Sequence, residues 1–99
     1  MPLKTTRFDA AEFLTNTDFQ TELLTDAFET GDATYIAVAL GVVARARGMT
    51  DVSRQAGVTR EALYKALSKD GDPRLSTLIG VIKALGLRLS IHTEATPLS

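Results

Sequence analysis

The sequence predicts one all-α domain of five or six helices that ends in a short β-strand. Apolar residues recur at helical spacing in successive segments, and Gly, Asp or Thr stands at the boundaries between them. Apolar and polar residues alternate over 87–92, which predicts the strand. Ninety-nine residues supply one hydrophobic core. We expect a single domain over 1–99, with an acidic helical extension (8–31), a helical core (32–86) and the strand (87–92).

Capping patterns predict two helices in the N-terminal third. Asp9 and Glu12 have the spacing of a capping box and begin a short helix. Thr17 and Gln20 repeat this spacing before a second helix, which Gly31 ends.

The centre of the chain predicts the most buried helix. Asp32 can cap a helix that runs to about Arg47 and is apolar around most of its circumference. Gly48 breaks this helix, and a brief one from about Thr50 to Ala56 follows.

Two more helices are expected before the strand. Gly57 turns the chain and Thr59 can cap a helix running to Ser68. After a turn-rich loop over 69–73, a final helix is closed by Gly86, and its apolar stripe contains Leu75, Leu78, Ile79, Ile82 and Leu85. The predicted core consists of Ile36, Leu40, Val43, Leu63, Leu67, Leu78, Ile82 and Leu85.

The expected strand presents Leu87, Leu89 and Ile91 on one side. No other segment reads as a strand, so its backbone N–H and C=O groups have no partner within the chain. We predict that these residues dimerise the protein by pairing with the same strand of a second copy. The rival hypothesis is that the strand extends the sheet of a partner protein.

Charge is divided unevenly along the chain, although the net charge is only −1. Residues 1–33 carry two basic and seven acidic side chains, whereas residues 34–69 carry six basic and two acidic ones. A basic centre can attract phosphates even in a slightly acidic chain, because close contacts depend on local potential. The acidic third favours a basic partner, which we expect to contact Glu22, Asp26 and Glu29.

The stretch 49–68 has the pattern of a helix-turn-helix. Small residues, Ser53 and Ala56, stand where the two helices would cross, and Gly57 supplies a left-handed turn residue. At 100° per residue, the polar side chains of the second helix fall within an arc of about 140°, opposite Leu63, Leu67, Ala62 and Ala66. Arg can bond guanine and Lys can meet phosphate in a major groove. The predicted contacts to double-stranded DNA are Arg54, Gln55, Thr59, Arg60, Glu61, Tyr64, Lys65, Ser68 and Lys69.

With these motifs the chain resembles the Cro/repressor-type helix-turn-helix superfamily, and within it the addiction-module antidote proteins. The resemblance is carried by 8–14, 39–49, 59–68 and 83–89. It implies an antitoxin that represses its own operon by binding an operator and neutralises a small basic toxin of the RelE/ParE type. The chain departs from the family pattern at Met49, where many such domains have a phosphate-contacting Gln, and at Asp72, where Asn is expected.

Other functional classes lack the residues that they need. The carboxylates near 22–29 have the spacing of an outer helix face and no catalytic partners, so we expect no enzyme. Without cysteine and with His92 as the single histidine, we expect neither a metal site nor a cofactor. The longest apolar run is too short to cross a bilayer and the N-terminus lacks a signal-peptide pattern, which favours a cytoplasmic protein.

Two alternatives to an antitoxin that binds DNA stay open at this point. The chain could be an interaction module for a basic partner, in which DNA binding is secondary or lost. It could instead be a prophage repressor that has no toxin partner.

Overall fold

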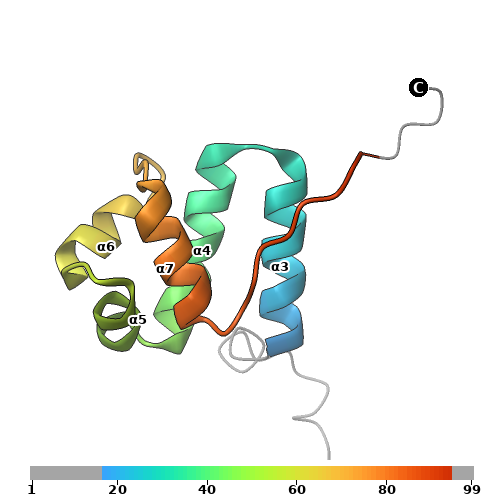
Figure 1. Cartoon of the computed structure of the whole chain (residues 1–99). Helices are drawn as coiled ribbons and strands as arrows, with labels where there is room; N and C mark the ends of the chain where they lie inside the picture. The colour runs from blue at the N-terminus through green and yellow to red at the C-terminus, as the bar shows by residue number, and fades with distance from the viewer. Residues whose placement is uncertain (1–16, 95–99) are drawn as a thin grey trace, which may run out of the picture.

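The computed structural model describes residues 17–94, and in these residues the chain forms five α-helices (Figure 1). The helices are α3 (Thr17–Thr30), α4 (Ala33–Arg47), α5 (Met49–Ala56), α6 (Arg60–Ala66) and α7 (Leu75–Ala84). The prediction of an all-α architecture is therefore confirmed for this part of the chain. The short helix predicted to begin at Asp9 lies outside the described residues.

Helices α3 and α4 lie side by side and run in opposite directions (Figure 1). Gly31 turns the chain between them with a φ of +71°. The predicted cap is present, because the Asp32 carboxylate accepts hydrogen bonds from the backbone N–H groups of Thr34 at 2.9 Å and Tyr35 at 3.3 Å.

Gln20, near the start of α3, is buried and joins this helix to α4. Its Oε1 accepts a hydrogen bond of 2.9 Å from Nε of Arg47, in the last turn of α4. Because a buried amide needs a hydrogen-bond partner, this contact holds the start of α3 against the end of α4.

The segment from α5 to α6 follows the prediction, except at its end. Helix α6 stops at Ala66, two residues before Ser68, because Leu67 leaves helical geometry with φ −100° and ψ 50°. The chain then folds back, so that a Cβ at Gly71 would collide with the backbone of Ala66. This close return leaves no room for another helical turn.

Helix α7 is rotated relative to its predicted stripe. Ile82 is buried as expected, but Leu75 is 69% exposed and Ile79 is 40% exposed, whereas Thr77 and Val81 are buried. The rotation follows the packing of α7 on α5.

The predicted strand is not formed within the single chain. Residues 87–94 have no regular secondary structure, and the part of the chain that the structure describes contains no strand. A strand is completed by hydrogen bonds to a neighbour, and no backbone hydrogen bond joins residues 88–94 to another part of the described chain. In Figure 1 the segment leaves the end of α7, passes α3 and runs outward from the helices.

The core is centred on α4. Six of the eight predicted core residues are buried, while Ile36 and Leu78 pack against the core and are only partly buried. Other buried residues complete this core, namely Leu24, Ala27, Ala39, Ala44, Met49, Val52 and Val81.

Candidate nucleic-acid interface

The turn between α5 and α6 is fixed by backbone hydrogen bonds. Gly57 adopts the left-handed conformation with φ +77° and donates to the carbonyl oxygen of Arg54 at 3.2 Å. Val58 donates to the carbonyl oxygen of Ser53 at 3.1 Å. Together these two bonds form a Schellman motif, which requires a residue that tolerates positive φ at position 57.

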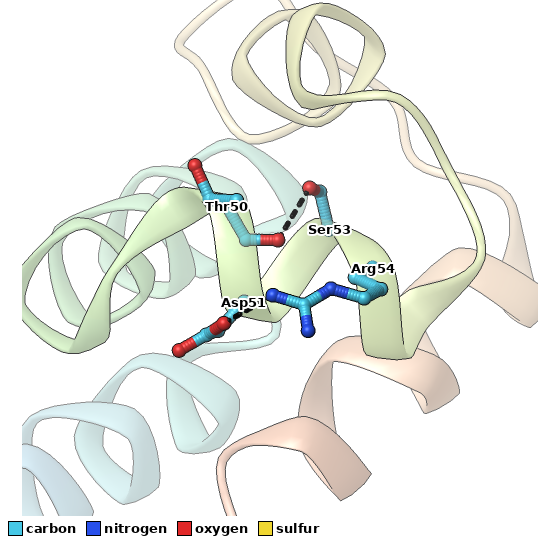
Figure 2. A network of polar contacts seen from close by, with 4 residues as sticks. All are labelled: Thr50, Asp51, Ser53 and Arg54. Carbon is cyan, nitrogen blue, oxygen red and sulfur yellow. Dashed lines mark hydrogen bonds and ion pairs between the residues drawn. The ribbon is translucent and has the colours of Figure 1, made fainter.

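Small residues allow the helices around this turn to approach closely. Ser53 is buried, and its hydroxyl donates to the carbonyl oxygen of Thr50 at 3.0 Å (Figure 2). Ala56 packs against α7 at Gly80, where a Cβ would lie 3.0 Å from the Ala56 Cα. Large side chains here would push α5 and α7 apart.

Helix α6 is held at its start by a cap and along one side by the core. The Thr59 hydroxyl accepts a hydrogen bond of 3.0 Å from the backbone N–H of Ala62. Leu63 is fully buried and Leu67 is 1% exposed. The Leu67 carbonyl lies so close to Gly41 of α4 that no Cβ fits between them. These contacts fix the rotation and position of α6.

The opposite side of α6 faces solvent. Arg60, Glu61, Tyr64 and Lys65 are all exposed, as the arc predicted. The Arg60 guanidinium lies 5.5 Å from the centroid of the Tyr64 ring, which places the two side chains together on the surface. Ala62 was expected to pack inward but is exposed.

The other predicted DNA contacts differ in how freely they face solvent. Gln55 and Lys69 are exposed. Arg54 is exposed but forms an ion pair with Asp51, one turn earlier on α5 (Figure 2). Ser68 is only partly exposed, and its hydroxyl donates to the carbonyl oxygen of Lys65 at 2.8 Å. Ser68 therefore turns back toward α6, since the helix has already ended.

One more exposed cation, Arg74, stands at the N-cap of α7, at the end of the loop that follows α6. The predicted DNA contacts ended at Lys69 and did not include it.

The predicted acidic residues belong to α3, which lies on the other side of the molecule from α6 (Figure 1). Glu22, Asp26 and Glu29 are exposed on α3, at helical spacing along one side. Asp26 accepts a hydrogen bond of 3.1 Å from the Tyr35 hydroxyl. This bond, with smaller contributions from desolvation and from the carboxylate charge, raises the pKa of Tyr35 above its usual 10.0.

The three residues predicted to form the dimer differ in how far they are buried. Leu87 is half-buried and packs against the core of its own chain. Leu89 is 44% exposed and Ile91 is 96% exposed. A groove lies between this segment and α3, with Leu24 and Phe28 of α3 in its lining.

None of the described helices is long and apolar enough to span a membrane. No three metal-ligating side chains gather in this part of the chain.

Comparison with known proteins gives the family. A protein family described as "Probable addiction module antidote protein" matches residues 4–93. An uncharacterized protein of Haemophilus influenzae is 42% identical over 85 residues, which span 86% of this chain and 88% of that relative. No solved structure matches the chain. With nearly its whole length matched, the chain belongs to the family of probable addiction module antidote proteins.

Proposed function

We propose that this antidote protein binds operator DNA as a dimer, with α6 in the major groove, and represses its own operon. The observation that carries the proposal is the exposed group formed by Arg60, Tyr64 and Lys65. The cap at Thr59 and the buried side of α6 hold the backbone of this group, so its side chains are presented at a fixed angle. A major groove admits one α-helix presented in this way.

The side chains in and around this group are assigned two roles, which are contact with the bases and contact with phosphate. Arg60, near the start of α6, is suited to paired hydrogen bonds with guanine, and Lys65 is suited to phosphate. Glu61 can accept a hydrogen bond from cytosine N4, or it can stabilise α6 through the positive end of the helix dipole. The flanking side chains contact phosphate, which positions the protein without reading sequence: Arg54, Gln55, Thr59, Ser68 and Lys69.

A binding titration with the chain's own upstream DNA tests this proposal. We expect Arg60→Ala to weaken binding by about 1–3 kcal/mol and to relax sequence preference. Lys65→Ala should weaken binding to all sequences and reduce the salt slope by about one. Lys83→Ala is the matched control, because Lys83 is an exposed lysine in the last turn of α7. Wild-type affinity in both α6 variants would overturn the proposal.

An antidote acts on a toxin, and we assign the toxin contact to α3. Exposed carboxylates at Glu22, Asp26 and Glu29 support a basic partner of the RelE/ParE type, since opposite charges speed association. Reversing all three charges should slow toxin association at least about tenfold at low salt and leave DNA binding unchanged. An unaltered association rate would refute this assignment. Both partners are expected in the cytoplasm.

A further inference from the structure

The terminal segment 88–94 is open to pairing along its backbone. No backbone–backbone hydrogen bond joins these residues to any other part of 17–94. Ser90 and His92 lie on the same side of the segment, with Ser90 Oγ 3.0 Å from His92 Nε2, as alternate residues of an extended chain do. The segment also passes α3 and leaves the helical bundle (Figure 1). Its conformation therefore suits a β-ladder that only a second chain can complete.

The sequence of this segment is complementary to itself about residue 91. In an antiparallel pair with Ile91 opposite Ile91, residue 88 of each copy faces residue 94 of the other. Arg88 then lies opposite Glu94 twice, once on each side of the two-fold axis. Residue 90 faces residue 92 in the same way, which puts Ser90 opposite His92.

In this register the polar pairs lie on one face of the two-stranded ladder, and Ile91 lies on the other face. Arg88 and Glu94 are exposed, and neither forms an ion pair with another described residue. Ile91, at 96% exposure, would lose contact with water at the axis. Of the two neighbouring registers, the one centred on Ser90 would put Arg88 opposite His92 and Glu94 opposite a glycine, and the one centred on His92 would put Glu94 opposite Ser90. Charge therefore selects the register centred on Ile91.

We propose that a second copy of this chain pairs antiparallel with residues 88–94, in the register that places Ile91 on the two-fold axis. The inference deepens the proposed function, because it names the surface of the dimer. Leu87 takes no part, since it packs against its own core. The interface consists of an on-axis isoleucine pair between two Arg88–Glu94 pairs.

Charge reversal within one chain gives the first test. Arg88→Glu or Glu94→Arg would place like charges opposite each other at two sites, so the dimer dissociation constant should rise about tenfold. The double variant Arg88→Glu/Glu94→Arg should restore it to within about twofold of wild type. Restoration would be intermolecular, because residues 88 and 94 of one extended chain lie about 20 Å apart. A double variant no tighter than the single variants would overturn the pairing.

Cysteine substitution then tests the register itself, since the chain contains no cysteine. Under mild oxidation, Ile91→Cys should give a disulfide-linked dimer, because side chains directly opposite each other lie about 5 Å apart. Leu89→Cys should not, since the two copies of residue 89 would be about 13 Å apart. Cross-linking by Ser90→Cys in preference to Ile91→Cys would overturn the register.

Light scattering and the DNA titration separate this inference from the proposed function. A wild-type dimer that binds operator while Ile91→Cys fails to cross-link would leave DNA binding intact and refute the pairing. A cross-linked dimer that does not bind operator DNA would support the pairing and refute the DNA-binding function.

Discussion

Helices α3 and α6 carry opposite charges on opposite sides of the molecule, and the structure holds them in different ways (Figure 1). Helix α6 has seven residues and depends on the Thr59 cap, the Gly57 turn and the buried Leu63. Helix α3 has fourteen residues and packs along α4. The exposed basic surface of α6 therefore depends on a few contacts of one short helix, whereas the acidic surface of α3 lies on a longer helix with more contacts along its length. Mutations can therefore separate the two surfaces.

The largest expected effect concerns the buried side of α6. Leu63→Ala should lower the free energy of unfolding by about 2–5 kcal/mol, because it leaves a cavity beneath the helix. Urea denaturation measures this change. Lys65→Ala is the control on the exposed side and should change stability by no more than about 0.5 kcal/mol. Equal losses would contradict the assignment of the two sides.

Gly41→Ala tests how tightly α4 supports the end of α6. Alanine in place of glycine normally stabilises a helix by about 1 kcal/mol. Here the added methyl would collide with the Leu67 carbonyl, so we expect a loss of about 1–3 kcal/mol instead. Thermal unfolding gives the sign of the change. A variant more stable than wild type would show that α4 and α6 do not approach so closely.

Removal of the α6 cap should have a smaller effect. Thr59→Ala loses the hydrogen bond to the Ala62 N–H and should cost about 1 kcal/mol of stability. Thr59→Asp is the matched control, because a carboxylate can also cap the helix. We expect it to retain most of the stability in chemical denaturation. An unchanged midpoint in Thr59→Ala would mean that the cap does not hold α6.

The smallest expected effect lies beside the acidic surface and depends on pH. The pKa of Tyr35 is raised by its hydrogen bond to Asp26, so the bond stabilises the fold while the hydroxyl stays protonated. This contribution should be complete below pH 10.0 and be lost as pH rises through the raised value. Melting temperatures of wild type and Tyr35→Phe should therefore converge at high pH. A melting-temperature advantage of wild type that grows at high pH would contradict this stabilising role of the protonated hydroxyl.

Local signals predicted most of the helix boundaries. Asp32 and Thr59 cap the helices that they were expected to cap, and Gly57 makes the expected turn, because each needs only its neighbours in sequence. The rotation of α7 could not be obtained in this way. Apolar residues cover more than one stripe of α7, and the contact between Gly80 and Ala56 selects the buried one.

The candidate site was predictable to a similar extent. Exposure of Arg60, Glu61 and Lys65 follows from the helical period alone. Ser68 was misplaced, because the chain folds back at Gly71 and ends α6 early. The alternation over 87–92 predicted a strand, but a strand needs a partner, and no other segment of residues 17–94 supplies one.

One set of affinities tests most directly whether the two charged surfaces serve two partners. Wild type, Arg60→Ala and the triple charge reversal at Glu22, Asp26 and Glu29 are each titrated with operator DNA and with the product of the neighbouring reading frame. We expect Arg60→Ala to lose DNA affinity only and the triple reversal to lose toxin affinity only. A folded variant that loses both partners together, or neither, would contradict the account.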